Sequence, residues 1–452
     1  LYPTTSFSQQ YNFINYSVGD GLVNSQVNRI TQDIRGSILF ATAGGISSYN
    51  GKVFLNYSKS NGLPDNIINA VIADARGNVL MGTKNGLAIF NGKDFWVVSD
   101  KDGLQSSNVL SLSLDKSGNI WTGTDAGLCV VNNSSEKCSV QKISLNGNKT
   151  IQFSYLYEDK EGNMWGGTVR DGIYYFSFNK STLLNNKILS KIPSEEIVVD
   201  GRHCNVFHFD NSNILCGNNV RTIYQEYSGT MWIGCWRSGI TKISSKGIFH
   251  YTAKDKTLPL SCDRIWAVQE DRSGQLWFAT DGFGVERIHK DSVFVRKNIQ
   301  LFTVSNGLPS NHIFCMYLDR EENLWFGTYN GGTSKLSDTR FVNYLSGTRG
   351  AEKNILSVFQ DINGNYWLGT FGGGAFIVDG KNLSGDGETK NFSWDQGISE
   401  SGVSAIHQTD DGILLFGTIG GGISMLNPKD MSKPGKIFSV IKREEKLPFN
   451  FM

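Results

Sequence analysis

The chain has 452 residues, which is enough for one large domain or for two to three ordinary ones. Its 43 Lys and Arg residues balance its 42 Asp and Glu residues, so no global charge draws it toward nucleic acid or anionic lipid. No apolar run approaches the roughly 18 residues that a membrane helix needs. The 51 glycines and the 12% aromatic content instead fit many short strands joined by tight turns.

The N-terminal residues 1–10 contain Ser6-Phe7-Ser8, which resembles the small-x-small end of a secretory signal peptide. The charged and apolar parts of such a signal are absent. We therefore expect residues 1–10 to be either the remnant of a signal peptide or a disordered terminus.

A ten-residue pattern recurs nine times along the chain. Its consensus is an acid, a Gly three residues later, a Trp or Leu six residues after the acid, and a closing Gly-Thr. The copies begin at Asp33, Asp74, Asp115, Asp159, Glu226, Asp271, Asp319, Asp361 and Thr409. Successive copies lie 41 to 48 residues apart, except for one gap of 67. A period near 45 residues is typical of a solenoid, a propeller or another repeat array.

Each unit predicts four antiparallel strands. In the second unit, the apolar run 67–73 suits a buried inner strand, and residues 79–83, 87–90 and 94–98 follow as three further strands separated by Gly-containing turns. No unit carries an amphipathic helical pattern, which disfavours a helical or leucine-rich solenoid. The predicted fold class is all-β, a β-propeller of four-stranded antiparallel blades.

One position of the repeat predicts how blades pack together. Six residues after the acid stand Leu39, Leu80, Trp121, Trp165, Trp232, Trp277, Trp325, Trp367 and Leu415. We interpret this row as the residue that packs between neighbouring blades. A ladder of tryptophans that stack on sugars is the alternative.

The gap of 67 residues contains an insertion rather than a tenth blade. Phe207-His208-Phe209 resembles Phe249-His250-Tyr251, the outer strand of the next unit. Residues 177–203 are therefore predicted to be inserted between the third and fourth strands of the fourth blade.

Nine blades are awkward for one ring, because propellers usually close with four to eight. Residues 13–16 and 341–344 each look like an outer strand with no blade before it. We expect residues 11–338 to form a seven-bladed propeller whose last blade takes its outer strand from the N-terminus, and residues 339–452 to begin a second propeller with two blades. A single ring of eight or nine blades is the alternative.

The units resemble a known repeat. Gly307-Leu308-Pro309-Ser310-Asn311, followed by Asp319 and Leu324-Trp325-Phe326-Gly327-Thr328, is close to the two-component regulator propeller repeat. The resemblance covers residues 11–441. Departures are local: Glu322 replaces the turn Gly, Cys235 replaces Thr, and Thr409 replaces the acid.

The resemblance implies a periplasmic sensor region of a bacterial, often hybrid, histidine kinase, without catalysis in the propeller itself. The implied partners are an oligosaccharide or other small-molecule ligand, a histidine kinase module of the same polypeptide, and a second copy of the chain in a homodimer. The repeat style also occurs in extracellular seven-bladed lyases.

Motifs for catalysis, metals and cofactors are missing from the sequence. It has no GxSxG, HExxH or P-loop, and its six histidines are scattered. Residues 379–388 are rich in acids but lack EF-hand spacing, so we predict a solvated hairpin there. The seven cysteines form no CxxC pair, and Cys129 with Cys138 is a candidate disulfide across a hairpin. We expect no cofactor and no metal.

Residues that break the repeat on one face of the propeller are the predicted ligand site. Loops between the second and third strands emerge there together with the linkers that enter each inner strand, and such loops commonly carry function. Aromatic faces stack on sugars, while Arg, Asp and Asn supply directional hydrogen bonds. The candidates are Arg170, Asp171, Trp236, Arg237, Asp281, Phe283, Tyr329, Asn330 and Phe371. Alternatively, these residues plug the channel or face a neighbouring domain.

Two other functions stay open. An extracellular lyase or hydrolase would need a His with an acid at the channel mouth, and His312 with the Asp281 loop is the pair to test. A purely structural or protein-binding propeller is the third reading.

Overall fold

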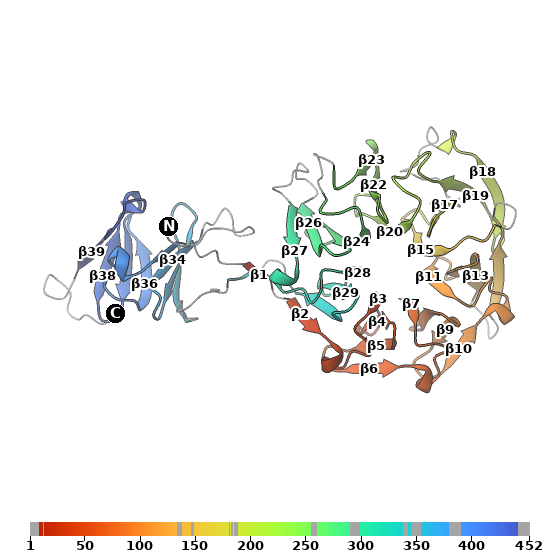
Figure 1. Ribbon diagram of the computed structural model, residues 1–452, viewed down its shortest axis with the longest axis horizontal. Helices are drawn as coiled ribbons and strands as arrows, with labels where there is room; N and C mark the ends of the chain where they lie inside the picture. The colour runs from red at the N-terminus through yellow and green to blue at the C-terminus, as the bar shows by residue number, and fades with distance from the viewer. Residues whose placement is uncertain are drawn as a thin grey trace. The chain divides into compact units, whose positions relative to one another are not determined.

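The computed structural model describes residues 9–11, 13–132, 138–145, 149–179, 181, 184, 189–254, 260–289, 299–337, 342–344, 354–378 and 390–441. Those residues are almost entirely strands and turns (Figure 1). The chain divides into two compact units, one of Phe13–Asp338 and one of Leu1–Asn12 with Thr339–Met452. Residues 379–388, the predicted hairpin, lie outside the described residues.

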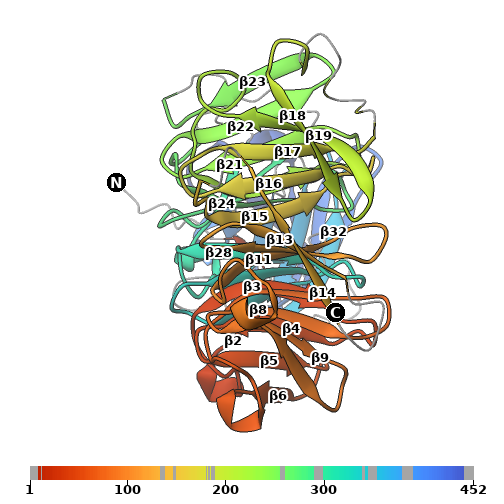
Figure 2. The ribbon, with the colours of Figure 1, turned by 90° about the vertical axis from the view of Figure 1, so that its right-hand side faces the viewer.

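The unit Phe13–Asp338 is a ring of seven antiparallel blades (Figure 1). Figure 2 shows this ring from its edge. The strands of each blade are given from the inner to the outer edge. Blade 1 is β3 (Val27–Gln32), β4 (Ile38–Thr42), β5 (Gly45–Tyr49) and β6 (Phe54–Tyr57). Blade 2 is β7 (Ile68–Ala73), β8 (Val79–Thr83), β9 (Gly86–Phe90) and β10 (Phe95–Val98). Blade 3 is β11 (Val109–Leu114), β12 (Ile120–Thr124), β13 (Leu128–Asn132) and β14 (Ser139–Ile143).

Blade 4 has five strands, β15 (Phe153–Glu158), β16 (Met164–Thr168), β17 (Ile173–Ser177), β19 (Arg202–Phe209) and β18 (Ser194–Val199). Blade 5 is β20 (Val220–Gln225), β21 (Met231–Cys235), β22 (Gly239–Ser244) and β23 (Gly247–Tyr251). Blade 6 is β24 (Ile265–Glu270), β25 (Gln275–Thr280), β26 (Val285–His289) and β27 (Ile299–Phe302). The predicted insertion in the fourth blade is confirmed, because β19 pairs with β17 and the inserted β18 adds a fifth strand outside it.

The N-terminal strand closes the ring. Blade 7 is β28 (Ile313–Leu318), β29 (Leu324–Thr328), β30 (Thr333–Leu336) and β2 (Phe13–Tyr16), so its outer strand comes from the start of the chain. Inner strand β28 of blade 7 packs beside β3 of blade 1. The first and last strands of the ring thus share one sheet.

The second unit contains two further blades. They are β32 (Ile355–Gln360), β33 (Tyr366–Thr370), β34 (Ala375–Val378), β35 (Lys390–Phe392), and β36 (Val403–Gln408), β37 (Leu414–Thr418), β38 (Gly422–Leu426), β39 (Phe438–Ile441). Separately, β1 (Gln9–Tyr11) pairs with β31 (Val342–Tyr344). Residues 9 and 10, expected in a signal remnant or disordered terminus, are therefore in a strand. The prediction of an all-β propeller fold with nine blades is confirmed.

Short 3₁₀ turns lead into several inner strands. They are η1 (Val18–Asp20), η2 (Lys59–Asn61), η3 (Asp100–Asp102), η5 (Val304–Asn306) and η6 (Trp394–Gln396), with η7 (Pro428–Asp430) after β38. In η5, Thr303 caps the N-terminus and Gly307 follows at φ +108°, a conformation that favours glycine. The Leu of each Gly-Leu linker, such as Leu308, is then buried.

The repeated acid and tryptophan form one structural unit. In blade 6, Asp271 Oδ1 accepts the backbone N–H of Gln275 at 3.0 Å, and its Oδ2 accepts the Trp277 indole N–H at 2.8 Å. The other five tryptophans donate to the acid of their own repeat in the same way. All six indoles are at most 2% exposed. They pack onto the following blade, as Trp325 does on Phe40, which confirms the packing interpretation and excludes a sugar-stacking ladder.

In the hairpin that contains Cys129 and Cys138, the strand register keeps the two cysteines apart. Cys129 lies opposite Lys142, and Cys138 precedes the outer strand. All seven cysteines of the chain are reduced in the structure, so the candidate disulfide between Cys129 and Cys138 is not formed.

Candidate functional site

The repeat turn places its loop residues at the start of the inner strands. In blade 6, Thr280 Oγ1 donates to the carbonyl of Gly284 at 2.7 Å, which holds the loop between the second and third strands. The Asp281 N–H then donates to the carbonyl of Arg264, the residue before β24, at 3.1 Å. Trp236 is tied in the same way to Asn219, at 2.7 Å. These bonds place both kinds of loop on one face, as the sequence predicted.

Aromatic rings from three neighbouring blades make a continuous row on this face. Trp236 of blade 5 meets Trp266 of blade 6 edge to face, with ring centroids 5.4 Å apart. Trp266 meets Phe314 of blade 7 at 4.6 Å, and Phe314 meets Tyr329 at 5.3 Å. Trp266 and Phe314 are the second residues of their inner strands. The row therefore follows the inner edge of the ring.

Three guanidinium groups surround this row. The Cζ atom of Arg221 lies 4.8 Å from the Trp266 ring and 5.6 Å from that of Trp236. Arg237 and Arg264 lie 5.8 and 5.9 Å from the Trp236 ring. Each contact is within the range of a cation–π interaction. Arg237 also adopts φ +63°, which is uncommon for a residue with a side chain and is found preferentially at functional sites.

Asp281 balances part of this charge. One carboxylate oxygen lies 3.3 Å from Arg264 Nη1, and the other lies 2.6 Å from His312 Nδ1. Arg264 and His312 are the residues just before the inner strands of blades 6 and 7. A single carboxylate thus links two blades at this face. We call the group the axial cluster: Arg221, Trp236, Arg237, Arg264, Trp266, Asp281, His312, Phe314 and Tyr329.

Two donors of the axial cluster lack acceptors among the described residues. The Trp266 Nε1 and Arg221 Nε atoms are buried, and neither has a hydrogen-bond partner. Burial is the main cause that lowers the pKa of Arg221, and the charge of Arg29 adds to it. Arg29 itself lies over the Tyr155 ring of blade 4, at 5.3 Å. An unpaired buried donor costs about 1–3 kcal/mol, which a ligand with an acceptor would recover.

The structure brings together only some of the predicted site residues. Trp236, Arg237, Asp281 and Tyr329 belong to the axial cluster. Phe283 is in the Asp281 loop and 42% exposed, and Asn330 accepts a hydrogen bond from Ser310 Oγ at 3.1 Å.

The other three predicted residues lie elsewhere. Arg170 is exposed in blade 4, where Asp171 pairs with Lys149 and Tyr174. Phe371 is on β33–β34 of the other unit, so it is not part of the ring.

The two-component regulator propeller family matches residues 103–126, 259–282 and 307–330. Each stretch contains the inner strand, the repeat turn and the second strand of one blade. Three stretches of the chain thus match the repeat of this family. No curated protein sequence matches the chain.

Solved structures resemble the chain. The extracellular domain of the hybrid two component system assigned as BT3049 from B. thetaiotaomicron is 23% identical, with 94% of this chain and 66% of that chain covered and a TM-score of 0.31. The chain thus spans just under two thirds of that domain. The corresponding domain of BT4673 is 18% identical, with 97% and 68% covered and a TM-score of 0.32.

A lyase resembles the chain in fold. A catalytically inactive histidine-to-alanine variant of virginiamycin B lyase from Staphylococcus aureus, with quinupristin, is 14% identical. The alignment covers 73% of this chain and 100% of that chain, with a TM-score of 0.52. Similarity at this identity shows the β-propeller fold alone.

Sequence reasoning missed Arg221, Arg264, Trp266 and Phe314. The signal that was overlooked is the second position of the inner strand. It holds Asn28 and Asn69 in blades 1 and 2, whose amides donate to the next blade, but Arg221, Trp266 and Phe314 in blades 5 to 7. A change from Asn to Arg and aromatic residues at one register position marks the cluster.

The described residues contain no group of three His, Cys, Asp or Glu side chains suited to hold a metal ion. Within the same part of the chain, no helix is long and apolar enough to cross a membrane.

Proposed function

We propose that this propeller is the periplasmic sensor region of a two-component signalling protein, and that it binds an oligosaccharide at the axial cluster. The bound ligand would act on a histidine kinase module of the same polypeptide, with dimerisation as part of the signal. Support comes from the family match and from the extracellular two-component domains that the chain resembles.

The observation that carries the proposal is the pairing of aromatic faces with unpaired donors. Sugars present apolar C–H faces, which pack on rings such as Trp236 and Trp266, and hydroxyl oxygens, which accept hydrogen bonds. The buried Trp266 Nε1 and Arg221 Nε atoms can donate to such oxygens. The axial cluster therefore offers both interactions that a sugar ring needs.

The charge of the axial cluster favours an acidic sugar. Arg221, Arg237 and Arg264 bring three positive charges, and Asp281 brings one negative charge. A guanidinium group binds a carboxylate or sulfate through two parallel hydrogen bonds. We expect oligosaccharides that carry uronic acid or sulfate groups to bind more tightly than neutral ones of the same length.

Isothermal titration of the purified chain against matched acidic and neutral oligosaccharides tests the proposal. The variant Arg237→Ala should weaken binding of the acidic ligand about tenfold, the typical value of one charged hydrogen bond. Arg170→Ala is the matched control, because Arg170 occupies the equivalent loop of blade 4 outside the cluster. Binding that is equally strong in Trp236→Ala, Arg237→Ala and wild type would remove the site.

The second candidate function is that of a lyase. The observation that favours it is the 2.6 Å contact between His312 Nδ1 and Asp281, since a carboxylate can orient a histidine for acid–base catalysis. The lyase of similar fold is inactive as a histidine-to-alanine variant. If the ring is a lyase, wild type should turn over an acidic oligosaccharide and His312→Ala should not. No turnover by wild type excludes this function.

A further inference from the structure

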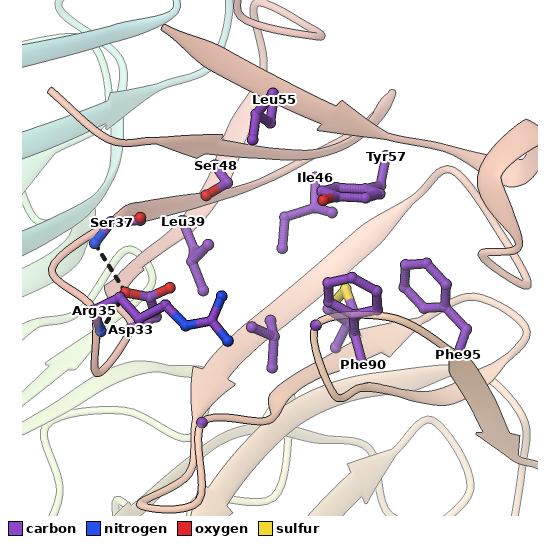
Figure 3. Close-up of a pocket in the computed structure, with 14 residues that line it drawn as sticks. Asp33, Arg35, Ser37, Leu39, Ile46, Ser48, Leu55, Tyr57, Phe90 and Phe95 are labelled. Atoms are coloured by element: carbon purple, nitrogen blue, oxygen red, sulfur yellow. Dashed lines mark hydrogen bonds between the residues drawn. The ribbon is translucent and has the colours of Figure 1, made fainter. Parts of the chain in front are cut away.

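A pocket on the ring opens between blades 1 and 2, well away from the loops that form the axial cluster. Its volume is about 150 Å³. Asp33 and Arg35 lie at one end of the pocket, and Tyr57, Phe90 and Phe95 lie toward the other (Figure 3). Leu39 lies between them. Leu39 occupies the repeat position that six other repeats fill with a buried tryptophan.

Blade 7 shows what fills this space elsewhere in the ring. The Trp325 ring packs on the next blade, with its centroid 5.5 Å from that of Phe40 and 6.2 Å from that of Tyr49. Tyr16, the last residue of the outer strand of blade 7, stacks on Trp325 at 5.9 Å with 24° between the ring planes. The indole is thus enclosed by three aromatic rings.

At the interface of blades 1 and 2, a residue occupies the position equivalent to each of the three rings around Trp325. Met81 matches Phe40 as the third residue of a second strand, and Phe90 matches Tyr49, since each lies opposite the first residue of that strand. Tyr57 matches Tyr16 as the last residue of the outer strand. Met81, Phe90 and Tyr57 all line the pocket. The walls that hold an indole are therefore present, and the indole is replaced by the smaller Leu39.

A second side chain is also smaller here. In blades 5, 6 and 7 a cation on the third strand covers the tryptophan: Lys242, Arg287 and Lys335 lie 4.9 to 5.6 Å from the rings of Trp232, Trp277 and Trp325. The residue opposite Leu39 is Ser48. Blade 2 also has a leucine, Leu80, but Ile89 lies opposite it. The combination of Leu39 with Ser48 explains why blade 1 has the pocket.

The repeat acid of blade 1, Asp33, has a carboxylate oxygen that can still accept an indole N–H. Asp33 Oδ1 accepts the backbone N–H groups of Arg35 and Ser37, at 2.9 and 2.8 Å, as Asp115 Oδ1 does from Ser117 and Asn119. In the six repeats with a tryptophan, a carboxylate oxygen of the acid accepts the indole N–H. Oδ2 of Asp33 has no donor among the described residues. In blade 2 the matching oxygen of Asp74 already accepts from Asn78 and Arg76.

We propose that the pocket between blades 1 and 2 is a binding site for a small planar aromatic ligand with a ring N–H, of the indole class. The ligand's ring would take the place of the missing tryptophan side chain and stack on Tyr57, and its N–H would donate to Asp33 Oδ2. The volume of about 150 Å³ is similar to that of an engineered protein cavity that binds benzene. The Arg35 guanidinium adds a cation at the rim of the pocket.

Saturation-transfer NMR with indole tests the site. Wild type should bind indole with a Kd of roughly 0.1–1 mM, the range expected for a ligand of this size. Leu39→Trp, which supplies the missing side chain, should abolish binding and raise the melting temperature. Ser48→Leu, which restores the pair found in blade 2, should weaken binding and serves if Leu39→Trp does not fold.

Indene, which has the shape of indole without the N–H, isolates the hydrogen bond to Asp33. Wild type should prefer indole over indene by about tenfold. Asp33→Asn keeps the acceptor for the turn but presents an amide to the ligand, so it should lose this preference without change in indene binding. No binding of indole to wild type, or equal binding to a folded Leu39→Trp variant, would overturn the proposal.

Discussion

The blade interfaces and the axial cluster use the same scaffold in opposite ways. At the interfaces, a repeat acid and a buried Trp recur from blade to blade, and Asp271 with Trp277 is one of six such pairs. In the axial cluster, the second position of the inner strand differs between blades, from Asn69 to Trp266. Repeated positions therefore carry stability, and we propose that the positions where blades differ carry recognition.

The difference follows from what each position contacts. A tryptophan at an interface is enclosed by two blades, so a smaller residue leaves a cavity where its neighbours do not fill the space, as happens at Leu39 beside Ser48. The second residue of an inner strand faces the ring axis. In blade 2, Asn69 spends its amide on the carbonyl of Val109, which joins neighbouring blades. Trp266 makes no such bond, and its indole N–H has no acceptor among the described residues.

Truncation at an interface should have the largest effect. Trp277→Ala removes a fully buried indole and leaves Asp271 Oδ2 without its donor. We expect a loss of about 3–5 kcal/mol in the free energy of unfolding. Urea denaturation measures it. Trp394→Ala is the control, because that side chain is 59% exposed and should cost less than about 1 kcal/mol. Equal losses in the two variants would contradict the role of the interface.

Truncation in the axial cluster should show the reverse pattern. Trp266→Ala removes a ring between Trp236 and Phe314, and we expect oligosaccharide affinity to fall about 10- to 100-fold, as for loss of a stacking platform. The unfolding free energy should fall by less than in Trp277→Ala, because Trp266 is only partly buried. Titration calorimetry and urea denaturation on the same variant separate the two effects. A large loss of stability with unchanged affinity would make Trp266 a structural residue.

The fold could be predicted almost completely from the sequence, because it rests on repeated local signals. The acid, Gly and Trp of each unit specify one turn and one interface, and nine copies reinforce each other. The closing strand Phe13–Tyr16 was predictable because it resembles the other outer strands. What was not predictable locally is β1, since its partner β31 is more than 300 residues away.

The site could be predicted only in part. Trp236 and Asp281 were found because they break the pattern in loops. Arg221 and Trp266 lie inside strands, where the backbone pairing between strands is compatible with side chains of any type. Their proximity depends on the curvature of the propeller ring and not on their spacing in the sequence. The pocket beside Leu39 was hidden for another reason. A Leu in a Trp position looks like a conservative exchange until the volume that it leaves is measured.

A buried carboxylate in blade 6, that of Glu286, predicts that the stability of the fold depends on pH. One residue of the third strand lies opposite the residue that follows the repeat Trp or Leu. In blades 1 and 5 its hydroxyl accepts the N–H of the incoming linker, as Ser47 does from Val23 and Thr241 from Cys216. In blade 6 this residue is Glu286, which accepts from Ser261 and whose Oε2 has no partner among the described residues. Burial raises the pKa of Glu286 above its ordinary value of 4.5.

The sign of the effect follows from the raised pKa. The folded state holds the proton of Glu286 more tightly than the unfolded state, so this group stabilises the fold least when both states are ionised. The free energy of unfolding should therefore fall as the pH rises from about 4.5 through the folded pKa. Glu286→Gln should remove this fall and be more stable than wild type at neutral pH, by about 1–3 kcal/mol. Urea denaturation between pH 4 and 8 measures both. A wild type and variant with parallel pH profiles would contradict the assignment.

The smallest effect is expected at the repeat turn, where one blade departs from the pattern without a change of conformation. Glu322 holds the place of the turn Gly at φ +69°, close to the φ +78° of Gly274 in blade 6. A residue with a Cβ is strained there, whereas glycine is not. Glu322→Gly loses an ion pair with Arg272 that is half-exposed and weak, so we expect a net gain of about 0.5–1 kcal/mol. Gly274→Ala should lose about 1 kcal/mol at the equivalent position. Thermal unfolding measures the change in stability of each variant. A gain in Glu322→Gly together with a loss in Gly274→Ala would show that this turn requires the same backbone conformation in both blades. A loss in Glu322→Gly would mean instead that the ion pair with Arg272 outweighs the strain.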